Sequence, residues 1–151
     1  MIVGINFIIP QVNDTLLWKI LNPIDPSNYY WYIDKSQTEV WNEDGSNDLF
    51  EKETYTGIDF SNHIKCKHKI IFLKAIANSF NVCEKTILTY EDFLRSDCQL
   101  VLLIYDCEFV EIYSKSFELL SIIENNAKDL GYNSISFINS TDNPRYKMSV
   151  L

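Results

Sequence analysis

The chain has 151 residues, 46% of them hydrophobic, and its 21 acidic and 13 basic side chains give a formal net charge of −8. This length is typical of one globular domain, so we expect residues 1–151 to fold as a single domain. The acidic balance argues against direct binding of DNA or RNA, whose phosphates attract Lys and Arg, and the 14% aromatic content argues against disorder.

The chain carries no sign of export or of membrane insertion. Its first ten residues lack the basic region and the small-residue cleavage site of a secretory signal. No apolar run approaches the roughly 20 residues that span a bilayer. We therefore expect a cytoplasmic protein without a membrane partner, in which the four cysteines are reduced thiols.

The first half of the chain predicts strands separated by short helices and loops. The opening run is β-branched and ends at Pro10, as a buried strand does. Two later segments alternate in polarity on either side of a polar tetrapeptide, as the strands of a hairpin do. In chain order we expect a strand over 2–9, a helix over 15–21, a hairpin of strands 29–33 and 38–41, a loop with one helical turn at most over 42–62, and a strand over 69–77.

The second half contains the clearest helix signals. Thr89 followed by Asp92 resembles a capping box, and Ser116 and Gly131 occupy the cap positions at the two ends of an amphipathic segment. We expect a helix over 90–95, tightly joined strands over 99–106 and 108–114, a helix from 117 to about 130, and strands over 134–138 and 146–151. This order favours an α+β fold, with a largely antiparallel sheet of about five to seven strands and two or three helices packed on one face.

Four segments of the chain resemble a known family. They are Gly4–Pro10, Tyr30–Ile33, Ser96–Asp106 and Asn143–Arg145. Together they resemble an uncharacterised family of low-GC Gram-positive bacteria, domain-of-unknown-function family 2691. The resemblance covers nearly the whole chain but implies no activity, because that family has no assigned catalytic or binding residues.

The sequence offers no assembled set of catalytic residues or metal ligands. Its four glycines cannot form a Walker loop or a dinucleotide fingerprint, and no nucleophile elbow accompanies the two histidines. His63, Cys66 and His68 could bind zinc with a fourth ligand from Cys83 or Cys98, but the spacing matches no common finger and neighbouring lysines would repel the ion. We therefore expect no metal or cofactor, and a non-enzymatic protein is the favoured interpretation.

Paired carboxylates occur at Asp106, Glu108 and Glu111. In an extended strand, Asp106 and Glu108 point to the same face, where they could share a proton or hold a cation. Asp106, however, lies at the predicted turn between two strands, and turns favour Asp for backbone reasons alone. A structural role is therefore the favoured interpretation of this pair.

The placement of charge is more informative than any motif. Residues 39–59 contain seven acids and one lysine, whereas residues 60–85 contain five lysines and one glutamate, which gives net charges of −6 and +4. The two segments could neutralise each other within the fold, or each could be solvated surface. We give these two interpretations together the same weight as a functional one, in which the acidic segment binds a partner.

Aromatic residues stand immediately before and within the acidic segment. Alternation in the strand 29–33 would bury Trp31 and Ile33 and leave Tyr30 and Tyr32 facing outward. Rings flanked by carboxylates are typical of a surface that binds a basic protein. We predict a protein-binding module, such as an immunity protein against a toxin or a phage or prophage inhibitor of a defence protein, with a partner-binding surface formed by Tyr30, Tyr32, Glu39, Trp41, Glu43, Asp44, Asp48 and Glu51.

An alternative site is the basic segment that follows. If residues 63–69 are extended, His63, Lys65, Lys67 and Lys69 share one face and could bind an anion. This predicts a small-molecule or nucleotide-binding domain, possibly an enzyme. It ranks second, because the chain has only two arginines for bidentate phosphate recognition. Self-association through a subunit surface is a third possibility.

Overall fold

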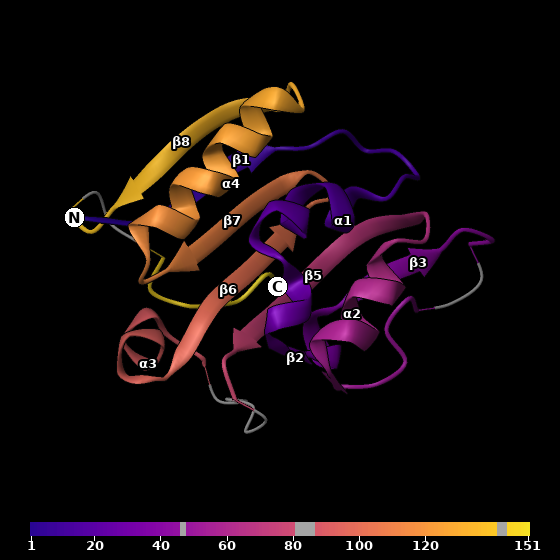
Figure 1. Ribbon diagram of the computed structural model, residues 1–151, viewed down its shortest axis with the longest axis horizontal. Helices are drawn as coiled ribbons and strands as arrows, with labels where there is room; N and C mark the ends of the chain where they lie inside the picture. Colours follow the sequence, from indigo (N-terminus) through magenta and orange to yellow (C-terminus); the bar gives the residue numbers. More distant parts are fainter. Residues whose placement is uncertain (46–47, 81–86, 142–144) are drawn as a thin grey trace.

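The computed structural model describes residues 1–45, 48–80, 87–141 and 145–151. The fold is α+β, as predicted, and all strand pairings are antiparallel (Figure 1). The strands are β1 (Ile2–Ile8), β2 (Tyr30–Ile33), β3 (Glu39–Asn42), β4 (Thr54–Tyr55), β5 (His68–Asn78), β6 (Cys98–Tyr105), β7 (Phe109–Ser114) and β8 (Asn133–Asn139). The helices are α1 (Leu16–Leu21), α2 (Gly57–Ile64), α3 (Tyr90–Arg95) and α4 (Phe117–Asp129), with 3-10 turns η1 (Asn22–Ile24), η2 (Pro26–Asn28) and η3 (Lys35–Gln37).

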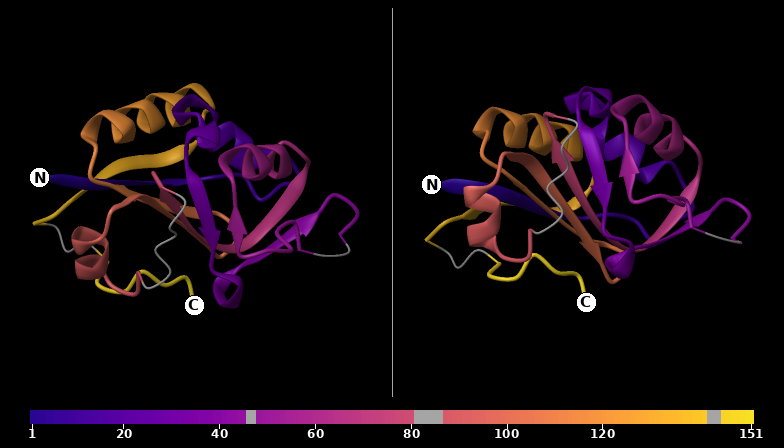
Figure 2. Two further views of the ribbon diagram at one scale, coloured as in Figure 1. Left: turned by 60° about the horizontal axis from the view of Figure 1, so that its bottom comes forward. Right: turned by 90° about the horizontal axis from the view of Figure 1, so that it is seen from below.

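Within the described ranges the sheet has eight strands, one more than the predicted upper number. Their order is β4-β2-β5-β6-β7-β1-β8, with β3 also paired to β5. Helices α1, α2 and α4 cover one face, here called the helix face, where the larger apolar core lies. There Trp31 stacks on Phe60 with 4.1 Å between ring centroids. The opposite face, here called the second face, is covered by α3 and by the C-terminal segment 145–151 (Figure 2).

The predicted caps of α3 and α4 are confirmed. The Thr89 hydroxyl accepts a bond from the Asp92 N–H, and the Asp92 carboxylate accepts one from the Thr89 N–H at 3.0 Å, which completes a capping box. The Ser116 hydroxyl accepts from the Leu119 N–H at 3.2 Å. Gly131 follows α4 with φ +76°, a backbone conformation in which a Cβ would be strained.

The predicted hairpin of residues 29–41 is wrong. Strands β2 and β3 do not pair with each other but lie one after the other along β5, where Tyr32 pairs with Ile76 and Trp41 pairs with Lys69. The intervening residues form η3, begun by the Asp34 carboxylate, which accepts from the Ser36 N–H at 3.0 Å. Because β5 has 11 residues, its edge is long enough for both strands.

Two other expectations differ from the structure. The predicted loop 42–62 contains most of α2, which begins where the Thr56 hydroxyl accepts from the Asp59 N–H at 3.2 Å. Its first residue, Gly57, lies so close to η2 that a Cβ would come within 2.1 Å of the Ser27 carbonyl oxygen. The predicted strand 146–151 is also wrong, since this segment forms only an isolated bridge between Lys147 and Thr89.

Candidate functional site

The predicted partner-binding surface is divided by the fold. Alternation in β2 is as expected, since Trp31 and Ile33 are buried while Tyr30 and Tyr32 are half-buried. The tyrosines, however, are not next to Trp41. The positions on β5 that pair with Tyr32 and with Trp41 are seven residues apart, which is roughly 23 Å along a strand.

Trp41 lies with four acidic residues at one end of the molecule, where β3 ends (Figure 1). The Trp41 side chain is 38% exposed, and its Nε1–H donates to the Glu39 carboxylate at 3.0 Å. After β3 the chain turns at Gly45, which has φ +74°, and returns to bridge Trp41 through Asp48. We call this surface the acidic tip and define it by Glu39, Trp41, Glu43, Asp44 and Asp48.

Lysines from neighbouring elements offset part of the charge of the acidic tip. Lys35 Nζ lies 2.9 Å from the Asp48 carboxylate, and Lys69 Nζ lies 5.9 Å from the centre of the Trp41 ring. Four acidic residues against these two lysines leave a net charge of −2. Glu51 is exposed beyond the tip, on the chain that leads to β4. Of these two lysines, only Lys69 belongs to the basic segment 60–85, so part of the charge of the acidic tip is offset by Lys35 from outside that segment.

The predicted basic segment is extended only at its end, where His68 and Lys69 begin β5, so its expected common face is wrong. His63 belongs to α2, where its Nδ1 lies 2.8 Å from a backbone carbonyl of the preceding helical turn. Lys65 Nζ lies 4.6 Å from the centre of the Trp18 ring, whereas Lys69 points to the acidic tip. Lys67 is exposed. An anion site made by these four residues remains a prediction without a converging geometry.

His68 is fully buried and helps to hold α1. Its Nε2 accepts from the Leu17 N–H at 3.1 Å, so Nδ1 carries the proton and donates to the Cys66 carbonyl at 2.8 Å. Burial lowers the pKa of His68, which keeps the ring neutral. In the part of the chain that the structure describes, no three His, Cys, Asp or Glu residues are grouped to hold a metal. Cys83 lies outside the described residues.

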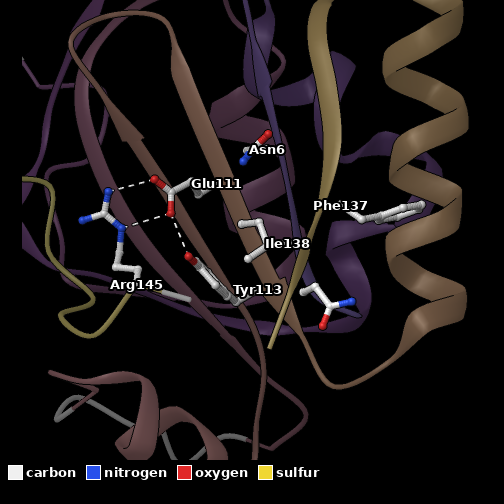
Figure 3. Close-up of a pocket in the computed structure, with 7 residues that line it drawn as sticks. Asn6, Glu111, Tyr113, Phe137, Ile138 and Arg145 are labelled. Carbon is white, nitrogen blue, oxygen red and sulfur yellow. Dashed lines mark hydrogen bonds and ion pairs between the residues drawn. The ribbon is translucent and has the colours of Figure 1, made fainter. Parts of the chain in front are cut away.

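A second candidate site lies on the second face around Glu111 of β7 (Figure 3). The Glu111 side chain is buried and faces Arg145 from the C-terminal segment. Arg145 donates to it twice, from Nε at 3.0 Å and from Nη2 at 2.8 Å. The hydroxyls of Tyr105 and Tyr113 donate at 2.7 and 2.8 Å, so each carboxylate oxygen accepts two bonds.

The electrostatics of this cluster favour an ionised Glu111 and neutral tyrosines. Burial by itself would raise the pKa of Glu111, but the bonds from Arg145 and the two tyrosines outweigh it and hold the pKa below its ordinary value. Burial, reinforced by the neighbouring carboxylate, raises the pKa of Tyr113. With its acceptor sites occupied, Glu111 anchors the C-terminal segment to the sheet.

A hollow of about 470 Å³ opens beside this ion pair, lined in part by Asn6, Tyr113 and Ile138 (Figure 3). Asn6 Oδ1 accepts from the Ser136 hydroxyl at 2.7 Å, and among the described residues its amide hydrogens have no hydrogen-bond acceptor. Gly4 has a role here, because a Cβ at this position would lie 2.8 Å from a β7 carbonyl oxygen and 3.1 Å from the Tyr113 ring. The absence of a side chain therefore lets β1 and β7 approach closely.

Nothing in the sequence connects Glu111 with Arg145. The two residues are 34 positions apart, and each is unremarkable in its own segment. Glu111 follows two other acids near a predicted turn, and Arg145 is one of two arginines in the chain. The only signal was chemical: an arginine fork matches a carboxylate, but the sequence does not indicate which of the 21 acidic residues is its partner.

Comparison with known proteins identifies a family and a similar curated protein. A family whose description is "Protein of unknown function (DUF2691)" matches residues 2–149. Among curated proteins, "Uncharacterized protein YncE" of Bacillus subtilis (strain 168) is 31% identical over 150 residues, which cover 97% of this chain and 98% of that protein. No solved structure is significantly similar. In the described ranges, no helix has the length and apolar character needed to cross a membrane.

Proposed function

Because the chain belongs to the bacterial family described as "Protein of unknown function (DUF2691)", we propose a function from its own geometry: it binds a basic protein through the acidic tip. The observation that carries this proposal is the 38% exposed Trp41 side chain among four carboxylates. Tryptophan is one of the side chains that most often dominate the binding energy of a protein interface, and surrounding acids select a basic partner.

The surroundings of Trp41 support a preformed binding surface. Strand β3 is held to β5, and the indole N–H is fixed by the Glu39 carboxylate. Binding therefore costs little side-chain entropy, because the ring is already ordered in the free protein. Lys69 near the ring limits the local charge, so a partner with a basic rim around an apolar pocket fits better than a uniformly basic one.

The overall charge of −8 would steer such a partner toward the protein from a distance. A basic toxin or a basic defence protein has the required chemistry. In the first case the chain would act as an immunity protein, and in the second as an inhibitor. Both functions require only that the partner's basic site is occupied, and neither requires a reaction.

The proposal is tested with a basic protein purified by its affinity for the full chain from the host organism. Substituting Trp41→Ala should raise the dissociation constant about tenfold or more, because a central aromatic anchor is removed. The double substitution Glu43→Lys and Asp44→Lys should slow association and weaken its dependence on salt. Binding is measured by surface plasmon resonance at two salt concentrations.

Matched controls separate the acidic tip from general surface effects. Tyr146→Ala removes another exposed ring, and Glu118→Lys with Asp129→Lys makes the same charge change on α4. Both controls should bind with nearly the wild-type affinity. If the Trp41 variant and the tip charge variant bind as tightly as the wild type, the acidic tip is not the interface.

As a second candidate function, we propose the binding of a small molecule in the hollow beside Glu111, a different place from the basic segment 63–69 that the sequence suggested. The observations in its favour are the volume of about 470 Å³ and the amide hydrogens of Asn6, which have no acceptor within the part of the chain that the structure describes. A ligand present at 100 times its dissociation constant would stabilise the fold by about 2.7 kcal/mol in a thermal-shift screen of nucleotides and metabolites. The substitution Asn6→Leu should abolish that shift and Trp41→Ala should leave it unchanged.

A further inference from the structure

Charged groups from neighbouring strands surround the Trp41 ring at the acidic tip. The preceding residue, Val40, is buried in the core of the helix face, so Trp41 points to the second face of the sheet. The Glu39 carboxylate accepts from the indole N–H at 3.0 Å and therefore lies at one edge of the ring. Lys69 of β5 pairs with Trp41 on one side, and Asp48 bridges it on the other. The ring is thus a flat apolar surface bordered by both signs of charge.

A cation of the chain itself already lies over this ring. Lys69 Nζ is 5.9 Å from the ring centre, close to the limit of about 6 Å for attraction between a cation and an aromatic face. In the comparable pair near α1, Lys65 Nζ lies only 4.6 Å from the centre of the Trp18 ring. The Lys69 contact shows that the Trp41 ring can receive a cation, and its length means that Lys69 uses little of the attraction.

The carboxylate at the edge of the ring favours a guanidinium over an ammonium. Glu39 uses one oxygen for the indole N–H, and among the described residues its other oxygen has no partner. A guanidinium is planar, so it can stack on the indole while its N–H groups bond to the carboxylate beside it. An ammonium is a compact and strongly hydrated charge, so it gains less from the face of a ring.

We infer that the acidic tip binds an arginine side chain of the basic partner, whose guanidinium lies over the Trp41 ring and bonds to the Glu39 carboxylate. The inference rests on the proposed function and adds which basic side chain the partner must present. In the free protein Lys69 partly occupies the position over the ring, and in the complex it gives way to the arginine. Lys69 is therefore an internal competitor of the partner.

The experiment compares two short peptides of equal charge as probes of the full chain. Both are blocked at their ends and carry two basic residues separated by glycines, which are arginines in one peptide and lysines in the other. Binding is followed in nitrogen–proton NMR spectra by the indole N–H signal of Trp41, which Trp41→Phe identifies. The arginine peptide should shift this signal and bind about threefold or more tightly than the lysine peptide.

Three variants separate the ring and the internal competitor from general charge. Trp41→Leu keeps every charge and removes the ring, so both peptides should then bind equally. Lys69→Met should raise the affinity for the arginine peptide about twofold or more, measured at high salt, where long-range attraction is screened. Lys65→Met is its matched control, because it also removes one lysine from the face of a tryptophan, and it should leave the affinity nearly unchanged.

The outcomes of this experiment distinguish the inference from the proposed function. Equal affinities of the two peptides for the unmodified chain, with a shifted Trp41 signal, would overturn the choice of arginine and leave the acidic tip as a site for basic partners. A Trp41 signal that neither peptide moves would also overturn the inference, whereas the purified partner and Trp41→Ala test the proposed function separately. An arginine preference that persists in folded Trp41→Leu would place the guanidinium elsewhere and equally overturn it.

Discussion

The two faces of the sheet are covered by elements that are held in place by different kinds of interaction. On the helix face, three helices cover a continuous apolar cluster that includes Trp31 and Phe60 at 0% exposure. On the second face, a short helix and an extended segment cover a smaller cluster beside buried charged groups. The helix face is therefore stabilised mainly by apolar area, whereas the second face depends on a few directed polar bonds.

Lys74 illustrates how the second face uses polar bonds. Its side chain is only 2% exposed, and its Nζ donates to the Ile87 carbonyl at 2.6 Å. Burial lowers the pKa of Lys74, although Asp34 and Asp92 act in the opposite direction. A buried amine tolerates little displacement of its partner, so this bond and the Glu111–Arg145 pair fix the covering segments in position.

The largest expected effect is on the helix face. Phe60→Ala should lower the free energy of unfolding by about 3–5 kcal/mol, because it leaves a cavity against Trp31 and Phe50. The measurement is urea unfolding followed by circular dichroism. Ile58→Ala, at a 69% exposed position of the same helix, should change stability by about 0.5 kcal/mol or less. Similar losses of stability for both variants would contradict the conclusion that buried apolar area stabilises the helix face.

The next largest effect belongs to the second face. Arg145→Met should cost about 3 kcal/mol, because it leaves the Glu111 carboxylate buried without its counter-ion. Adding Glu111→Gln should restore part of the loss, since the uncompensated charge disappears. Arg95→Met, at an exposed arginine of α3, should have almost no effect in the same urea titrations. If the double variant lost as much stability as the two single variants together, the result would contradict an energetic coupling between Arg145 and Glu111.

The two faces should also lose stability in different pH ranges. Burial holds the pKa of His68 below 6.5, so as the pH falls below 6.5 the unfolded chain binds the proton first. Stability should then fall by up to about 1.4 kcal/mol per pH unit. The folded-state pKa of Glu111 lies below 4.5, so its contribution is complete above pH 4.5 and is lost as the pH falls further.

These ranges are separated by urea unfolding at pH values from 7.5 to 3, roughly spanning both ordinary pKa values. His68→Gln should flatten the upper part of the stability profile, whereas Glu111→Gln should flatten the lower part. If the free energy of unfolding of the His68→Gln variant still falls between pH 6.5 and 5, another titratable group causes this pH dependence.

The smallest effects concern the helix caps, one on each face. Ser116→Ala and Thr89→Ala should each cost about 1 kcal/mol, because each leaves a helix N–H without its acceptor. Thr15→Ala is the matched control, since the Thr15 side chain makes no cap bond to α1. Amide hydrogen exchange should show faster opening of the first turn in α4 and α3 only. Equal changes in all three variants would show that the cap bonds do not matter.

Sequence patterns anticipated much of the fold where the deciding bonds are local. The capping box of Thr89 and Asp92 joins residues three positions apart, and the β6–β7 turn needs only Asp106 and Cys107 with positive φ. Alternation also predicted that Trp31 is buried. The hairpin prediction failed because its strands satisfy their backbone bonds on β5, and no local pattern distinguishes these two partners.

The candidate sites were predictable to different degrees. Composition and alternation identified the residues of the acidic tip, but only the fold placed Trp41 away from Tyr32. The basic segment failed as a common face because α2 extends through His63. The Glu111 cluster was absent from the sequence-based prediction, because its two charged members come from a central strand and from the C-terminal segment.

By itself, the amino-acid sequence determined the α+β class, the net charge, the positions of most strands and the ends of α3 and α4. Periodicity and caps depend on residues within about four positions of one another, so they can be recognised along the chain. Only the tertiary structure decided that His68 caps α1 across 51 positions, and that Arg145 anchors to Glu111 across 34. Such contacts arise from how the strands are ordered in the sheet, which local patterns do not specify.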